Sequence, residues 1–152
     1  MIDLSSNNPI PSGTRLLGID YGSKVTGTAL YQVERDPFPM PFSRIIVKSQ
    51  SQVLLELKQI VSDELIDIIV LGVPYMVDGR ETELSRKIKL FGQELATLTS
   101  LPLALQDETL STFEAQERMK NSPRYNFKVD PKQIDTLCAA IILEDFCRNR
   151  GQ

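Results

Sequence analysis

The chain has 152 residues, the usual size of one domain, and its hydrophobic fraction of 41% is sufficient for one core. Its 20 acidic and 17 basic residues give a net charge of −3, which excludes a protein that binds nucleic acid by bulk electrostatics. Any contact with nucleic acid must therefore be made by a local basic patch or through a bound metal ion. Because the sequence contains no histidine, Ser-His-Asp triads and histidine-rich zinc sites are excluded as well.

The chain begins with a polar segment that lacks the basic and apolar blocks of a signal peptide. We expect residues 1–13 to be a disordered tail and residues 14–152 to form one domain. No apolar run reaches the length of about 20 residues that a membrane helix needs. The sequence therefore predicts a soluble cytoplasmic protein.

Three short strands and a helix are predicted in the first half of the domain. Residues 15–20 form an apolar run that ends in an acid, and residues 25–33 and 44–48 are rich in β-branched and aromatic side chains. Their short connections predict antiparallel pairing. Apolar residues then recur at helical spacing over residues 50–64, which indicates an amphipathic helix.

Strands and helices alternate after that point. Residues 67–73 form a continuous apolar run, typical of a strand buried on both faces, and residues 101–106 predict a fifth strand. Asp78 and Gly79 open the helix between these two strands, and Ser111 with Glu114 forms a capping box for the next helix.

The last helix is predicted to start at Asp130, with Asp130 as its N-cap, Pro131 in the first turn and Gln133 completing the cap. Cys138 and Cys147 lie in this helix, too far apart for a disulfide, so they are expected to be free thiols in a reducing compartment.

The order of elements predicts an α/β fold. Strand-helix-strand alternation implies right-handed parallel crossovers, and the first three strands add antiparallel pairs. The expected result is a mixed five-stranded sheet with helices on both faces and the first strand in the centre. This is the RNase H-like architecture.

Four acidic residues stand where chemistry is a better explanation than structure. Asp20 ends the first strand, and Asp107 and Glu108 end the fifth, so their carboxylates should meet at one edge of the sheet. Because side chains alternate along a strand, only one of Asp107 and Glu108 should share a metal ion with Asp20. Asp135 begins a helical face that is otherwise apolar.

Each acid also has a structural explanation. Asp20 could introduce the turn at Gly22, Asp107 and Glu108 could interact with the dipole of the following helix, and Asp135 could lie at the edge of the core. Taken together, crowded carboxylates repel one another, and Mg²⁺ or Mn²⁺ would relieve that repulsion. Bound in this way, the metal would activate water and hold a scissile phosphate.

A local basic patch is predicted beside the acids. We expect six basic residues to contact nucleic acid: Lys24, Arg118, Lys120, Arg124, Lys128 and Lys132. Five of them surround one loop that also carries Tyr125 and Phe127, and this loop leads into the helix of Asp135. Basic residues between positions 80 and 89 are a second candidate, although neighbouring glutamates dilute their charge.

Four segments in order resemble the YqgF (RuvX) family, relatives of RuvC-type Holliday-junction resolvases. They are LGIDYGSK at 17–24, VLGVP at 70–74 followed by Asp78-Gly79, DETLST at 107–112, and the stretch from Val129 through Asp135 to Glu144. The resemblance covers nearly the whole chain, from about residue 16 to residue 146.

The resemblance implies an RNase H-like fold, a divalent-metal nuclease and maturation of the 5′ end of 16S ribosomal RNA precursors. It also implies that Asp20, Asp107 or Glu108, and Asp135 are the acids of the site. Two residues depart from related patterns. Thr109 stands where the family usually has arginine, and Cys138 follows Asp135 by one turn, where a further acid could stand. Fewer ligands would weaken the metal site and the activity.

Other functions remain open at this point. A Holliday-junction nuclease acting on DNA is one alternative, and a catalytically weak module that binds RNA or ribosome-assembly partners is another. The segment from Asp20 to Gly27 also resembles the phosphate loop of sugar-kinase-like phosphotransferases, but those proteins enclose ATP between two such domains. Metal-dependent cleavage would separate a nuclease from a binding module, and ATP binding would identify a kinase. Neither the choice between RNA and DNA nor the oligomeric state follows from the sequence.

Overall fold

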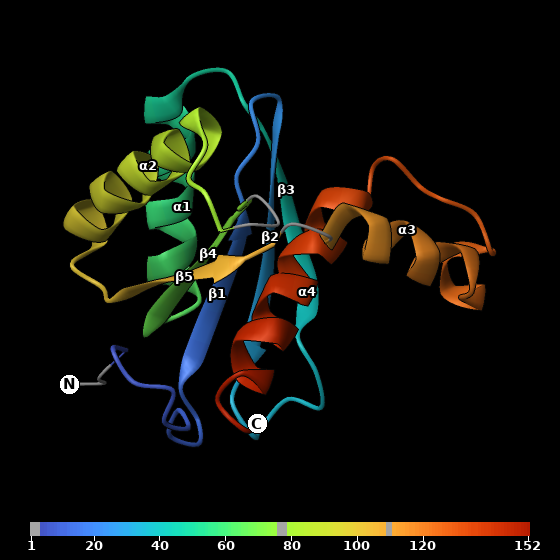
Figure 1. Cartoon of the computed structure of the whole chain (residues 1–152), viewed down its shortest axis with the longest axis horizontal. Helices are drawn as coiled ribbons and strands as arrows, with labels where there is room; N and C mark the ends of the chain where they lie inside the picture. Colours follow the sequence, from blue (N-terminus) through green and yellow to red (C-terminus); the bar gives the residue numbers. More distant parts are fainter. Residues whose placement is uncertain (1–3, 76–78, 109–110) are drawn as a thin grey trace.

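The computed structural model describes residues 4–75, 79–108 and 111–152. Its centre is one mixed sheet of five strands in the order β3-β2-β1-β4-β5 (Figure 1). The strands are β1 (Arg15–Asp20), β2 (Val25–Gln32), β3 (Met40–Ile46), β4 (Ile68–Val73) and β5 (Leu103–Asp107). The helices are α1 (Gln50–Asp63), α2 (Glu83–Thr99), α3 (Ser111–Lys120), the short 3₁₀ helix η1 (Pro123–Tyr125) and α4 (Ile134–Arg148).

The pairing of the strands confirms the predicted α/β topology. β1 is central, antiparallel to β2 and parallel to β4, while β2 pairs antiparallel with β3 and β4 pairs parallel with β5. The first three strands thus form a meander, and the helices α1 and α2 connect the strands that follow.

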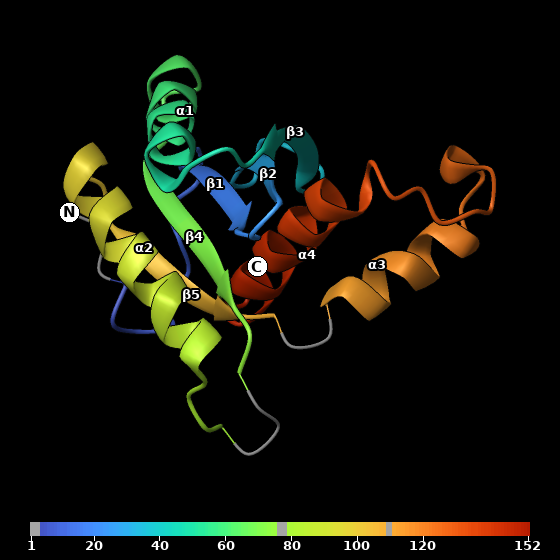
Figure 2. The ribbon, with the colours of Figure 1, turned by 90° about the horizontal axis from the view of Figure 1, so that it is seen from above.

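Helices cover both faces of the sheet, as expected. α1 and α2 pack on one face, where Leu17, Ile69 and Phe91 are fully buried, and α4 packs on the other face with Leu16 and Leu143. α3 contacts α4, η1 contacts α3, and both elements extend away from the sheet (Figure 2). We call residues 111–127, which contain both elements, the arm.

Element boundaries differ most from the expectation at three places. β3 begins at Met40, because its first residues pair with β2 despite the proline at position 41. α4 begins only at Ile134, since Asp130 accepts hydrogen bonds from the backbone of Lys132 and the side chain of Gln133 and so caps a turn instead of the helix. α2 begins at Glu83 with Thr82 as its N-cap, and Asp78 lies outside the described residues.

The predicted capping box of α3 is also wrong. Ser111 is the first residue of the helix, and its hydroxyl donates to Glu108 Oε2 at 3.3 Å. Glu114 instead forms an ion pair with Arg118 at 2.7 Å, four residues further along the helix. The Glu114 carboxylate therefore pairs with Arg118, one turn further along the helix, instead of capping the helix N-terminus.

Residues 4–13 form no helix or strand, but the structure does not leave them unattached. Ile10 is buried, with 2% of its surface exposed, and its carbonyl accepts a hydrogen bond from the Gln152 side chain. The Arg150 guanidinium donates to the carbonyl oxygens of Leu4 and Asn8. Contacts with the distant C-terminus therefore hold residues 4–10. The disordered tail at residues 1–13 stays a prediction.

Both cysteines, Cys138 and Cys147, are buried and free, as predicted. Within the described part of the chain, no helix has the length and apolar composition that crossing a membrane would require.

Candidate active site

Asp20 is positioned by the alternation of side chains at the end of β1. Ile19 is buried in the core under α1 and α2, and the Tyr21 ring stacks on Phe91 of α2 with 3.9 Å between centroids and 6° between planes. Asp20, between them, consequently lies on the α4 side of the sheet. The chain then turns at Gly22, where a Cβ would come within 2.4 Å of the Val25 carbonyl oxygen.

Glu108 reaches Asp20 from the end of β5. Its backbone N–H donates to the carbonyl of Val73 at 3.1 Å, and its side chain forms a hydrogen bond with the carboxyl group of Asp20. Gly72 of β4 provides the space, because a Cβ at this position would lie 2.9 Å from the Glu108 carboxyl group. The fourth strand thus ends without an acid of its own and makes room for one from its neighbour.

Asp135 approaches the same place from the first turn of α4. Gly27 of β2 is the cross-strand partner of Asp20, and a Cβ at Gly27 would lie only 2.1 Å from the backbone oxygen of Asp135. Only glycine at this position allows α4 to rest on β2 so closely. As a result, the charge of Asp135 acts on Asp20 and raises its pKa.

Burial makes the Asp20–Glu108 pair difficult to ionise fully. Loss of solvent raises the pKa of Glu108 to about 9, with the neighbouring charge of Asp20 as the second cause. Burial also raises the pKa of Asp20 to about 6, against the opposing effect of the hydrogen bond with Glu108. Near neutral pH, therefore, one proton stays on Glu108 and is donated to the ionised Asp20.

The raised pKa values predict that metal-free protein loses stability as pH increases. For an acid whose pKa is raised on folding, the stabilisation is complete below the unfolded pKa and disappears as pH rises through the folded pKa. The relevant window runs from about pH 4 to about pH 9, given ordinary values near 4 and folded values of about 6 and 9. In thermal melts with EDTA, we expect the melting temperature to fall across this window.

Neutral variants provide the control for this prediction. Asp20→Asn and Glu108→Gln remove the charge that burial opposes, so they should flatten the pH dependence and melt at or above the wild-type temperature at pH 8. Addition of Mn²⁺ should stabilise the wild type more than either variant. A lower melting temperature for metal-free Asp20→Asn at pH 8 would instead identify Asp20 as a structural turn residue.

The structure separates the two acids at the end of β5. Glu108 is partly buried and contacts Asp20, whereas Asp107 is exposed and makes only a minor contribution to the raised pKa of Glu108. Both line an open cavity of about 320 Å³ together with Ser111 and Asp145. Glu108 is thus the acid of β5 that contacts Asp20. Which of the two acids binds a metal ion stays a prediction.

Cys138 occupies the position one turn after Asp135 and faces the acid pair. Its thiol lies 3.9 Å from the Thr112 hydroxyl, and burial raises its pKa to about 12, with Asp20 adding to the effect. A neutral thiol therefore stands where a further carboxylate could have stood, and it adds no negative charge.

The acids do not form a ready-made ligand cluster. Across residues 4–75, 79–108 and 111–152, no group of three or more Asp, Glu, Cys or His side chains is close enough to hold a metal ion. Asp20 and Glu108 are in contact, and Asp135 is within electrostatic reach of Asp20. Two hydrogen-bonded carboxyl groups with raised pKa values nevertheless fit a hard cation, which would replace the shared proton.

The predicted basic residues fall into two groups. Arg118 pairs with Glu144 at 2.7 Å and with Glu114, and Lys120 pairs with Glu117 at 3.4 Å, so their charges are compensated. The others, Lys24, Arg124, Lys128 and Lys132, are exposed and form no ion pair within 4 Å with any residue that the structure describes. In the second candidate patch, Arg86 and Lys89 both contact Glu81.

The sequence did not predict the roles of three residues that shape the site. Gly27 and Gly72 provide the clearance described above, and only their place beside Asp20 and in the VLGVP segment could have drawn attention to them. Arg44 of β3 pairs with Gly27 across the strands, and its charge lowers the pKa of Asp135 against the raising effect of burial. A single arginine on an edge strand carries no sequence signal for this role.

Comparison with known proteins identifies the family. The model of the family described as "RuvX: Holliday junction resolvase" matches residues 14–149. The chain belongs to the RuvX family. It is 34% identical over 151 residues to a protein of Protochlamydia amoebophila named "Putative pre-16S rRNA nuclease", covering 95% of this chain and 98% of that one. A protein of Rickettsia canadensis with the same name is 35% identical over 86% of this chain and 84% of its own length.

Solved structures confirm the fold. Thermus thermophilus RuvC superposes with a TM-score of 0.59 at 13% identity, over 89% of this chain and 96% of that chain. The yeast mitochondrial Holliday junction resolvase Ydc2 gives a TM-score of 0.55 at 14% identity, over 94% of this chain and 81% of that chain. The RuvX member thus shares the RNase H-like architecture of these resolvases.

Proposed function

We propose that this RuvX member is a divalent-metal-dependent nuclease that hydrolyses phosphodiester bonds, and that its substrate is the 5′ end of precursor 16S ribosomal RNA. The observation that carries the proposal is the hydrogen-bonded pair of Asp20 and Glu108 at the carboxyl ends of β1 and β5. Burying two carboxyl groups together costs stability, and a catalytic role explains that cost better than a structural one.

Asp20, Glu108 and Asp135 are the residues that would hold Mg²⁺ or Mn²⁺, since carboxylate oxygens are the ligands these ions prefer. When bound, a divalent ion lowers the pKa of coordinated water and neutralises charge on the phosphate. In the metal-free chain Glu108 holds the proton that it shares with Asp20, and this proton would leave as the ion binds. Cys138 would stay protonated beside them. Asp107 is exposed, and we do not assign it a ligand role.

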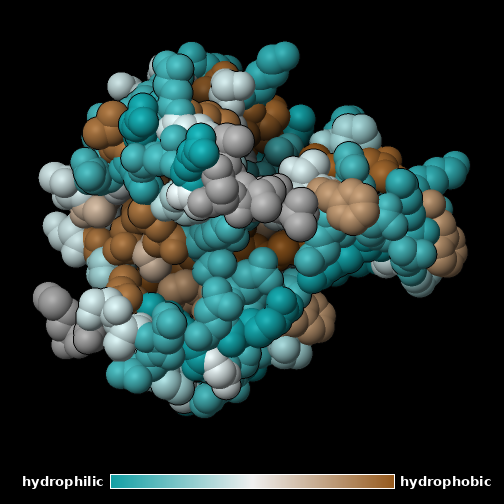
Figure 3. Space-filling view, in the orientation of Figure 1, coloured by the Kyte–Doolittle hydropathy of each residue, from teal (hydrophilic) through white to brown (hydrophobic). Residues whose placement is uncertain are grey.

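The names of the relatives favour RNA as the substrate. We propose that the RNA contacts the cations without ion pairs: Lys24, Arg124, Lys128 and Lys132. Hydrophilic side chains cover most of the arm in the view of Figure 3. Thr109, which stands where the family usually has arginine, lies outside the described residues. A cytoplasmic location and contact with ribosome-assembly partners complete the proposal, and the two free thiols support a reducing compartment.

A cleavage assay tests this proposal. Purified protein is incubated with an end-labelled RNA that spans the 5′ end of mature 16S rRNA, and separately with a four-way DNA junction, in Mg²⁺, Mn²⁺ or EDTA. We expect cleavage of the RNA only in the presence of metal. Cleavage of the junction alone would support the resolvase alternative, and RNA binding without any cleavage would identify a binding module.

A further inference from the structure

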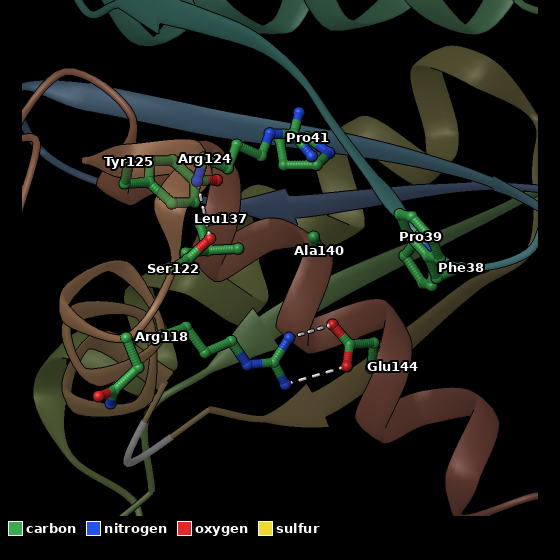
Figure 4. A pocket seen from close by; sticks show the side chains of 11 residues that line it. Phe38, Pro39, Pro41, Arg118, Ser122, Arg124, Tyr125, Leu137, Ala140 and Glu144 are labelled. Atoms are coloured by element: carbon green, nitrogen blue, oxygen red, sulfur yellow. Dashed lines mark hydrogen bonds and ion pairs between the residues drawn. The ribbon is translucent and has the colours of Figure 1, made fainter. Parts of the chain in front are cut away.

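A second cavity lies on the side of α4 that faces away from the acids. It has a volume of about 510 Å³ and opens between the arm, α4 and the residues that lead into β3 (Figure 4). Leu137 and Ala140 of α4 form its floor, while Phe38 on one side and Tyr125 on the other form its walls. The size is that of a pocket for a small ligand, which ranges from about 300 to 1,000 Å³.

The aromatic wall is held in place by the arm. Tyr125 is partly buried against the cluster of Ala115, Met119 and Leu137, and its backbone N–H donates to the Ser122 carbonyl at 3.2 Å. The opposite wall is apolar and open, since 52% of the Phe38 surface is exposed. Both sides of the cavity therefore present aromatic surface to a ligand.

The charges around the cavity are not balanced. The charged residues that line the cavity are Arg118, Arg124 and Glu144, which together carry one net positive charge. Arg118 is paired with Glu144, and Figure 4 shows this two-pronged contact at one end. Arg124, at the other end, has no ion pair within 4 Å in the described segments, and its guanidinium lies 6.0 Å from the centre of the Tyr125 ring. The cavity therefore combines an aromatic platform with one uncompensated cation.

A flat ring that carries a negative charge matches this combination, and a nucleotide has both features. Stacking on aromatic side chains, with arginine on the backbone phosphate, is how proteins bind unpaired bases. Leu137 in the cavity floor follows Asp135 by two residues, about half a helical turn. The cavity and Asp135 thus share the N-terminal half of α4.

We propose that this cavity binds one unpaired nucleotide of the strand being cut, with its base stacked on Tyr125 and its phosphate on Arg124. The proposal rests on the function proposed above, because it assigns the ligand to the nuclease substrate. It adds a preference among RNA substrates that the acids alone do not provide. Substrates with a single-stranded flank next to the cleavage point should bind more tightly than blunt duplexes.

Fluorescence of 2-aminopurine tests the proposal without any need for cleavage. The probe is placed in the single-stranded flank of a short RNA duplex and titrated with the full-length protein in EDTA. Stacking on Tyr125 should quench the fluorescence in the wild type and in Tyr125→Phe. Tyr125→Leu should abolish the quenching, and its affinity for the RNA should be about fivefold lower or more. Arg124→Ala should weaken binding and reduce the slope of log affinity against log salt concentration by about one.

Matched controls come from the same loop. Phe127 is 60% exposed and does not line the cavity, so Phe127→Leu should quench as the wild type does. Lys128→Ala should lower the affinity without changing the quenching, and thermal melts establish that each variant is folded.

Equal quenching by Tyr125→Leu and the wild type would overturn the proposal, as would an absence of RNA binding, which would point to a protein partner for this cavity. The cleavage assay separates the two proposals. Quenching that depends on Tyr125 without metal-dependent cleavage would retain the nucleotide site and reject the nuclease, whereas cleavage with unaltered quenching in Tyr125→Leu would do the reverse.

Discussion

Asp20→Asn and Asp135→Asn should each reduce metal-dependent cleavage roughly 100-fold or more, because a metal ion supplies several kcal/mol of transition-state stabilisation that depends on its ligands. The fold should be retained, since neither carboxylate forms an ion pair within the described residues. Initial rates with saturating Mn²⁺, together with circular dichroism of each variant, measure both effects. Near wild-type rates in either variant would remove that acid from the mechanism.

The two acids at the end of β5 provide an internal comparison within the same assay. Glu108 is hydrogen-bonded to Asp20, so Glu108→Gln should reduce cleavage as strongly as Asp20→Asn. Asp107 is exposed, and Asp107→Asn should retain most of the activity. The reverse ranking would mean that the metal-bound arrangement differs from the metal-free one and that Asp107 is the ligand.

The strand order and the place of Asp20 could be predicted because they depend on local pattern. A strand that ends in an acid is recognised from a few consecutive residues alone, and the alternation of strands and helices restricts the topology to few choices. The start of α4 could not be predicted in the same way. Asp130 followed by proline has the composition of a helix cap, but its side chain is used by a turn over the next three residues.

Contacts between distant segments account for the rest of what the sequence could not predict. Whether Asp107 or Glu108 meets Asp20 depends on the space left by Gly72 in another strand. Arg118 looked available for nucleic acid, yet Glu144, 26 residues away, neutralises it. Arg150 and Gln152 hold the N-terminal segment in a similar long-range contact. Each case pairs groups whose proximity arises only when the sheet and α4 come together.

Gly27→Ala should have the largest effect on stability of any single methyl addition considered for this chain. The new Cβ would meet the backbone oxygen of Asp135 at 2.1 Å, its carbonyl carbon at 2.2 Å and the nitrogen of Thr136 at 2.7 Å. Backbone atoms cannot rotate away as a side chain can, so α4 must move as a whole. Overpacking of this kind costs about 3 kcal/mol or more, which lowers the melting temperature of a domain this size by roughly 10 °C.

Gly92→Ala is the matched control, since its Cβ would be closest to a methyl group of Leu71, at 2.8 Å, and this side chain can adjust. Alanine also favours the helix by about 1 kcal/mol relative to glycine, so this variant should melt close to the wild type. Gly27→Ala should in addition lose cleavage below its melting temperature, because moving α4 separates Asp135 from Asp20. If both variants melted together with the wild type, α4 would not rest on β2 through Gly27, and the site would need another explanation for how Asp135 reaches the acid pair.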